Sequence, residues 1–338
     1  MATPLKVFVF ENYLRGQCSA KMKSILEMQD VWREAGIELV DKVKQADLIL
    51  TNYMDCEMYA ACRSKKKTCG VVICERFDAC SLGESLQHYK NRQVIGVFSE
   101  FMHRDFPSVA GQTYRGRHHL WLLRRAQGLN TPADEKHRSV DAKFQHKLRA
   151  VPWNLWQYSH LTAKGDMARA QKLSKSLKTR DVFAVFHEHK EFPCIEAHRA
   201  EARRIVREGK WTSFTDACPK EVYLSQLAQS RVVVAPWGLG ERIAADQFAI
   251  WAGCVLIKPR CDFVQTVPDL YADETYYVPC RPDWSDLAEV IDRVLSDYAT
   301  YIARTQAAQQ VFREWTQRKF TQHFCEELKD AYQQWKAK

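Results

Sequence analysis

Short apolar runs alternate with amphipathic helical stretches twice along this 338-residue chain, and this alternation limits the folds open to it. The strand-like runs of the first half are residues 5–10, 46–51, 71–74 and 94–98. Between the first two runs, residues 19–35 carry apolar side chains three or four apart, which predicts a helix ending at Gly36. Short apolar strands separated by helices indicate a parallel sheet covered on both faces.

The second half repeats this pattern. Its predicted strands are residues 181–186, 231–235, 253–257 and 276–278, and its predicted helices are residues 195–208, 222–229, 241–252, 285–295, 297–315 and 319–335. We expect Ser285 to cap the helix that follows it. The fold class expected is therefore α/β, with two Rossmann-like doubly wound domains facing a cleft.

A polar, lysine-rich stretch near residues 160–180 separates the two halves. We expect an N-terminal domain over residues 1–165, a C-terminal domain over 166–315, and a last helix over 316–338 that packs back on the first domain. In open α/β sheets, ligands bind beyond the carboxyl ends of the strands. Functional residues are therefore expected in the loops that follow strands.

Composition narrows the class of protein. Hydrophobic residues make up 46% of the chain and charged residues 27%, which is ordinary for a globular protein and argues against disorder or a coiled coil. No apolar run is long enough to span a membrane, and no signal peptide is recognisable at the start. With 12 cysteines but no Cys-x-x-Cys pair, we expect reduced, buried thiols in a cytoplasmic protein, with peripheral membrane contact left open.

The segment 230–259 is the richest in chemical signals. A strand leads into a turn with Gly238 and Gly240, which let the backbone approach a ligand closely, and then into a predicted helix near Glu241. Free N–H groups at a helix start favour phosphate, and the forked cation of Arg242 suits a diphosphate. The dinucleotide fingerprint fails because Ile243 stands where a glycine is needed, and no Walker A motif is present. The alternative is a glycine turn that only connects a strand to a helix.

Here the chain resembles the donor-site segment of exostosin-like and family-1-like glycosyltransferases of the GT-B fold. The matching residues are 238–241, Asp246, Ala249, 252–259, 267–271, 275–279, 284–287 and, upstream, His198-Arg199. The resemblance implies a sugar transferase that takes its donor as a nucleotide diphosphate sugar of the UDP or GDP type. Relatives often carry Arg-Asp-Phe-Glu-Ala on this helix, whereas residues 245–249 read Ala-Asp-Gln-Phe-Ala, so the arginine and the second carboxylate of that pattern are missing.

This resemblance and the loop positions together assign the donor site. The residues expected to hold the nucleotide sugar are Gly238, Gly240, Glu241, Arg242, Asp246, His187, Lys190, His198 and Arg199. No Asp-x-Asp is present, so we expect the leaving diphosphate to be met by protein cations, with no metal and no further cofactor. His187 and His189 could together bind a metal ion, but the sequence indicates no third ligand.

A general base is expected from loops of the first half. The candidates chosen are Glu11, Glu75 and Asp78, which follow predicted strands; Asp55, Glu100 and His103 hold similar positions. Solvated loop carboxylates are the alternative for each of these acids. An inverting reaction would need one of them, whereas a retaining reaction leaves the question open.

The formal net charge of +9 suits phosphate-bearing ligands. The basic stretch 114–149 has two interpretations: a contact for an anionic acceptor or a membrane surface, or a solvated helical face. Trp237 is a candidate for stacking on a sugar, and Trp251 is expected in the core. The expected partners are the nucleotide-sugar donor and a saccharide acceptor, anionic and lipid-linked forms included, but not nucleic acid. Two other functions stay open: a sugar-nucleotide epimerase on the same fold, and a non-catalytic protein that binds polyanions or nucleic acid.

Overall fold

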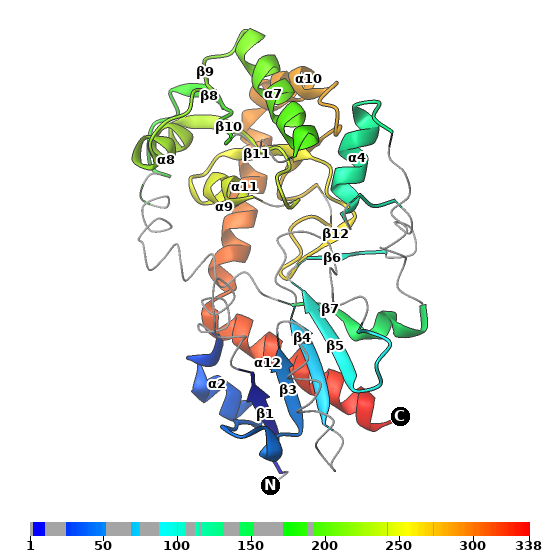
Figure 1. The fold of residues 1–338 in the computed structure, drawn as a ribbon. Coiled ribbons are helices and arrows are strands. Elements are labelled where there is room, and N and C mark those ends of the chain that lie inside the picture. Colours follow the sequence, from blue (N-terminus) through cyan, green and yellow to red (C-terminus); the bar gives the residue numbers. More distant parts are fainter. Residues whose placement is uncertain are drawn as a thin grey trace.

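The computed structural model describes residues 3–10, 25–51, 69–74, 88–99, 101–105, 112–114, 117–130, 142–151, 172, 174–187, 192–241, 243–272 and 274–338. They form two lobes, each built on a parallel sheet. Helices α11 (Tyr298–Glu314) and α12 (Gln317–Lys336) follow one another from the second lobe to the first (Figure 1). Two helix-bearing parallel sheets confirm the predicted α/β class with two Rossmann-like domains.

The first sheet has the strand order β2-β1-β3-β4-β5-β7, and its strands pair in parallel. Its strands are β1 (Leu5–Val9), β2 (Ile37–Leu39), β3 (Leu48–Thr51), β4 (Gly70–Cys74), β5 (Val94–Ser99) and β7 (Leu148–Ala150). The inner strands β3, β4 and β5 are buried along their whole length, which explains why they read as continuous apolar runs. The sequence does not predict the edge strands β2 and β7, because three residues are too few to show a period.

Helices α2 (Gln29–Glu34) and α12 pack on one face of this sheet. Phe324 of α12 lies edge-on to Trp32 of α2 and to Phe98 of β5, with ring centroids 6.1 and 5.7 Å apart. All three rings are buried, so apolar packing holds the last helix on the first sheet. Arg149 of β7 adds an ion pair to Glu327 of α12 at 2.6 Å.

The second sheet has the order β13-β11-β10-β8-β9, again with parallel pairing. Its strands are β8 (Arg180–Phe183), β9 (Ser213–Phe214), β10 (Ser230–Val234), β11 (Val255–Pro259) and β13 (Val278–Cys280), and its helices are α7 (Pro193–Glu208), α8 (Lys220–Ala228), α9 (Ala244–Trp251), α10 (Leu287–Ser296) and α11. Val232 and Val234 face the core shared with α7 and α10, whereas Val233 faces the core shared with α8, α9 and α11. This alternation places helices on both faces of the sheet.

Each sheet contains a point at which the order of its strands reverses. After β8 the chain passes to β9 on one side and then to β10 on the other side of β8. In the first sheet, β2 and β3 flank β1 in the same way. Ligand crevices form at such points, beyond the carboxyl ends of the strands. In the second lobe, the topology therefore points to the loops that follow β8 and β10.

Two segments from the first half of the chain pack on the second lobe. Helix α4 (His118–Ala126) buries Leu120 and Leu123 in the core formed with α8 and α9. Strand β6 (Met102–His103) pairs antiparallel with β12 (Val264–Gln265). This two-stranded ribbon lies between the two parallel sheets (Figure 1). The boundary expected at residue 165 falls between the two sheets in sequence, but α4 and β6, which precede it, pack on the second lobe.

Details of the second lobe depart from the sequence predictions. Helix α9 begins at Ala244, three residues after the expected start at 241, because residues 238–241 form an irregular turn. Ser285 does not cap α10: its hydroxyl donates to Asp283 Oδ1 at 2.8 Å, and Asp286 occupies the N-cap position. The basic helix α4 is not simply a solvated face, since His118 and His119 are buried with its leucines.

Two further expectations concern burial and the membrane. Of the cysteines between 56 and 80, Cys69 and Cys74 are described and both are buried, while the other three lie outside the described residues. In the part of the chain that the structure describes, no helix has the length and apolar character of a membrane-spanning segment.

Candidate functional site

The guanidinium of Arg199, on α7, joins the two loops at the switch point of the second sheet. Its Nη1 donates to the carbonyl of His187, after β8, at 2.6 Å. Its Nε donates to the carbonyl of Trp237, after β10, at 3.4 Å. Arg199 is only 6% exposed, and burial lowers its pKa. A cation is therefore fixed where the strand order predicts a ligand.

The absence of a side chain at Gly238 makes room for this cation. A Cβ at that position would lie 2.7 Å from Arg199 Nη2. The turn also closes on itself, because the Gly238 N–H donates to the carbonyl of Gly240 at 3.0 Å. The missing side chain at Gly238 thus accommodates Arg199, and the close approach to a ligand expected from the sequence stays a prediction.

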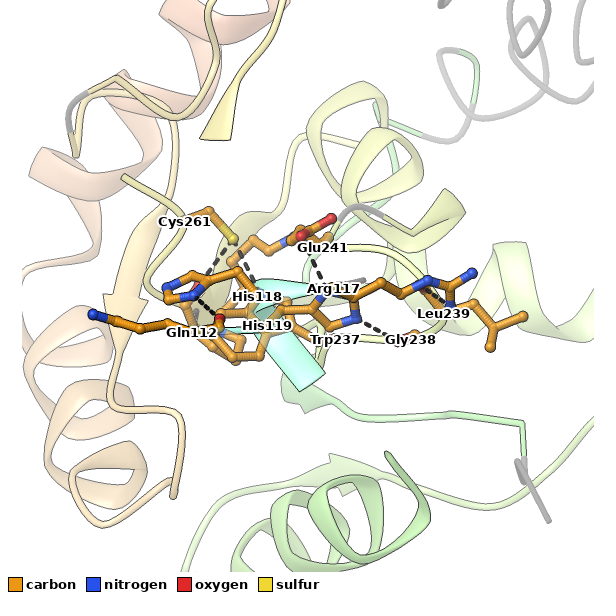
Figure 2. Close-up of polar contacts among 11 residues, drawn as sticks. Gln112, Arg117, His118, His119, Trp237, Gly238, Leu239, Glu241 and Cys261 are labelled. Atoms are coloured by element: carbon orange, nitrogen blue, oxygen red, sulfur yellow. Dashed lines mark hydrogen bonds and ion pairs between the residues drawn. The ribbon is translucent and has the colours of Figure 1, made fainter. Parts of the chain in front are cut away.

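Arg117 and His119, at the start of α4, also contact this turn, as Figure 2 shows. Arg117 Nη1 donates to the carbonyl of Leu239 at 2.8 Å. The His119 ring places Nε2 at 3.2 Å from the carbonyl of Gly238 and Nδ1 at 2.9 Å from Glu241 Oε1. Both ring nitrogens of His119 thus face oxygen atoms of the turn.

Glu241 therefore points into the protein. Its side chain is fully buried beside His119. The sequence placed it among the residues expected to hold the nucleotide sugar, but in the described structure its carboxylate contacts His119 of α4. Through its contact with His119, Glu241 stabilises the conformation of the turn. Direct contact of Glu241 with a ligand stays a prediction.

Asp246, on the first turn of α9, is also internal. Its Oδ2 lies 2.5 Å from Lys258 Nζ and accepts a hydrogen bond from the Tyr271 hydroxyl at 2.8 Å. Lys258 also donates to the carbonyl of Glu241 at 2.6 Å, so it connects β11 to the turn. Both charged side chains are almost wholly buried, and this ion pair locks the start of α9 to the sheet.

His198 is packed between indoles. Its ring stacks on Trp284 with centroids 4.8 Å apart and on Trp237 at 6.0 Å. Burial, with a smaller effect of the Arg199 charge, lowers the pKa of His198 to about 3. A neutral, 3% exposed imidazole does not favour the phosphate contact expected from the sequence. Trp237 is fully buried as well, so it is not placed to stack on a sugar, and Trp251 lies in the core as expected.

The remaining predicted residues divide between described and undescribed parts. His187 is exposed at the end of the β8 loop. The catalytic candidates Glu11, Glu75 and Asp78, and the donor residues Arg242 and Lys190, lie outside the described residues. Their roles stay predictions.

A cavity of about 560 Å³ opens beyond the carboxyl ends of β11 and β13. Its lining residues are Gln112, His118, Leu122, Arg260, Asp262, Phe263, Pro279, Cys280, Arg281, Pro282 and Asp286. Burial is the main cause that lowers the pKa of His118, whose Nδ1 lies 2.7 Å from the carbonyl of Gln112. The cavity thus lies at the same edge of the sheet as the glycine turn.

Sequence reasoning did not identify His119, Arg117 and Lys258 as partners of the turn. The pair His118-His119 stands out in the basic stretch, but nothing local indicates that it meets a segment 122 residues away. Among the described residues, no three His, Cys, Asp or Glu side chains group as a metal site would require.

The comparison with known proteins finds similar solved structures but no relative by sequence. No family model matches the chain, and no curated protein matches it significantly. A glycosyltransferase from Rickettsia africae ESF-5 is similar over 99% of both chains at 10% identity, with a TM-score of 0.45. An alpha-glucosyltransferase in complex with UDP-glucose and DNA is similar over 97% of this chain and 98% of its own, at 13% identity and a TM-score of 0.41. An alpha1,3-fucosyltransferase is similar over 90% of this chain and 83% of its own, at 12% identity and a TM-score of 0.40.

Proposed function

We propose that this protein is a glycosyltransferase of the GT-B type, which moves a sugar from a nucleotide diphosphate sugar to a saccharide acceptor. The carrying observation is the switch point of the second sheet, where the buried guanidinium of Arg199 ties together the loops after β8 and β10. Doubly wound sheets bind nucleotides at this place. The support for this proposal is therefore the position of Arg199 between the loops after β8 and β10.

The electrostatics of this corner suit a departing diphosphate. Lys190 follows the β8 strand and Arg242 follows the glycine turn in sequence, which adds two cations to the loops that Arg199 joins. Fixed cations and backbone N–H groups stabilise developing negative charge when they are oriented before the reaction. The donor would be of the UDP or GDP type, and the charge of the leaving group would be met without a metal ion.

The first lobe would bind the acceptor and supply the base. Glu11 follows β1 by two residues and Glu75 follows β4 directly, with Asp78 three residues later. These are loops at carboxyl ends of strands, where the substrate of an open sheet binds. A carboxylate there would take the proton of an acceptor hydroxyl in an inverting reaction.

Calorimetry with UDP and with GDP tests the donor site. The wild type should bind one of them, and Arg242→Ala should weaken that binding by about tenfold or more. Arg231→Ala is a matched control, because Arg231 is an exposed cation at the amino end of β10, on the other edge of the sheet. Equal binding by the wild type and Arg242→Ala would overturn the assignment.

Product analysis separates this proposal from its rivals. A transferase releases the nucleotide diphosphate in step with transfer to an added saccharide, whereas an epimerase converts the donor alone. Transfer should persist in excess EDTA if protein cations meet the leaving group. Tight DNA binding that falls steeply with salt, without sugar transfer, would support a polyanion-binding protein instead.

A further inference from the structure

A cavity of about 470 Å³ lies in the first lobe, at the edge of the sheet away from the proposed acceptor loops. Its lining residues are Lys90, Arg92, Ile95, Lys143, Phe144, His146, Lys147, Ala331, Gln334, Trp335 and Lys338. They come from the start of β5 and the turn before it, from the 3-10 segment Ala142–Lys147 before β7, and from the end of α12 and the residues after it. Because two of these segments precede parallel strands, the cavity lies at amino ends, whereas the proposed acceptor loops follow carboxyl ends.

Positive charge surrounds this cavity. Five lysine or arginine residues and His146 line it, and none of the lining residues that the structure describes is an Asp or Glu. Asp330, which precedes the lining residue Ala331, is already in an ion pair with Arg149 at 2.6 Å. The charge of the lining cations is thus not balanced within the lining.

Lys147 brings this charge into the interior. It is 8% exposed, and its Nζ donates to the carbonyls of Tyr89 at 2.8 Å and Asn91 at 3.0 Å. An ammonium carries three N–H bonds, and these two carbonyls account for two of them. Burial, with a smaller effect of the nearby Lys338 charge, lowers the pKa of Lys147 to about 8.

The walls between the cations are flat and apolar. The Phe144 ring has the Nζ atoms of Lys143 and Lys147 each 5.1 Å from its centroid. The Trp335 indole donates to the carbonyl of Arg92 at 3.2 Å, which fixes α12 against the turn before β5. A ligand that combines negative charge with a carbon skeleton matches both kinds of surface.

We propose that this cavity binds an organic phosphate with several negative charges, which Lys90, Arg92 and Lys147 hold while its carbon skeleton lies against Phe144 and Trp335. A free phosphate ester and a phospholipid headgroup share this chemistry. The site is separate from the proposed donor site and does not depend on the proposed function.

Binding of inositol 1,4,5-trisphosphate, followed by calorimetry, tests the site. The double variant Lys90→Ala/Arg92→Ala should raise Kd by about tenfold or more, because each exposed side chain loses a charge-assisted contact. Lys42→Ala/Lys44→Ala is the matched control, since it removes two exposed lysines of the same lobe that do not line the cavity. The control should keep the wild-type Kd, and Arg242→Ala, a variant of the proposed donor site, should keep it as well.

Vesicles distinguish the two sources of phosphate. Flotation with phosphatidylcholine vesicles that contain phosphatidylinositol 4,5-bisphosphate, lost in the Lys90/Arg92 variant alone, would identify a lipid headgroup. Binding of the soluble trisphosphate without flotation would identify a free phosphate ester. The proposal is overturned if the wild type binds neither probe, if the two double variants weaken binding equally, or if Arg242→Ala weakens it as much as Lys90→Ala/Arg92→Ala.

Discussion

His119 on α4 and Glu241 in the glycine turn meet with Nδ1 and Oε1 2.9 Å apart, and both side chains are fully buried. This contact joins a helix from the first half of the chain to the turn proposed to hold a diphosphate. Since α4 also reaches the carbonyls of Gly238 and Leu239, the conformation of the turn depends on a segment from outside its own sheet.

Glu241→Ala should therefore destabilise the protein. Removing one partner leaves the other polar group buried without its hydrogen-bond partner, and we expect the free energy of unfolding to fall by about 3 kcal/mol. His119→Ala should cost a similar amount. Urea unfolding of both single variants and the double variant measures the coupling, because the double variant should lose clearly less than the sum. Strictly additive losses would show that the two side chains do not stabilise each other.

Gly238→Ala should reduce nucleotide affinity more than stability. The new Cβ would lie 2.7 Å from Arg199 Nη2, so the guanidinium must leave its bridging position between the two loops. Calorimetry with UDP or GDP should show a loss of about tenfold. Gly36→Ala serves as the control: its positive φ of 73° makes alanine unfavourable, but it lies in the other lobe and should leave nucleotide binding unchanged. Equal affinities for Gly238→Ala and the wild type would contradict the role of Arg199.

Acidification should destabilise the protein through His198. In the unfolded chain this histidine binds a proton near pH 6.5, whereas in the folded protein its pKa is about 3. Below pH 6.5 the unfolded state holds one more proton, so the stabilisation present above pH 6.5 is lost as the pH falls toward 3. The loss is about 1.4 kcal/mol per pH unit from this group.

His198→Phe keeps an aromatic ring between Trp237 and Trp284 but removes the titrating group. The free energy of unfolding, measured in urea from neutral pH downward, should fall less steeply for this variant than for the wild type. Burial also lowers the pKa of His118, and that contribution remains in both proteins. Parallel curves for the two proteins would exclude a contribution from His198.

Phe324→Ala should show that the last helix stabilises the first lobe. The ring is fully buried between Trp32 and Phe98, and its loss should lower the free energy of unfolding by about 3–5 kcal/mol. Gln333→Ala is a control on the exposed side of the same helix and should change stability by less than about 0.5 kcal/mol. Equal stability of the two variants would mean that α12 is not part of that core in solution.

The sequence by itself determined the fold class and most of the longer helices and buried strands. Continuous apolar runs such as 71–74 and 232–235 gave buried parallel strands, because a strand covered on both faces exposes no side to water. The amphipathic stretch 285–295 gave helix α10 for the equivalent reason, since one helical face must be buried. Both patterns are local and can be recognised without knowing the partner surface.

Only the tertiary structure decided which polar groups face a ligand and which face one another. Glu241 and Asp246 stand in sequence where donor-binding carboxylates would, yet His119 and Lys258 hold them inside the protein. Likewise, the basic residues around Lys147 gather at one cavity from three distant segments. A periodic pattern tells how much of a segment is buried but not what covers it, and a charge can be assigned a role only when the path of the chain has placed its partner.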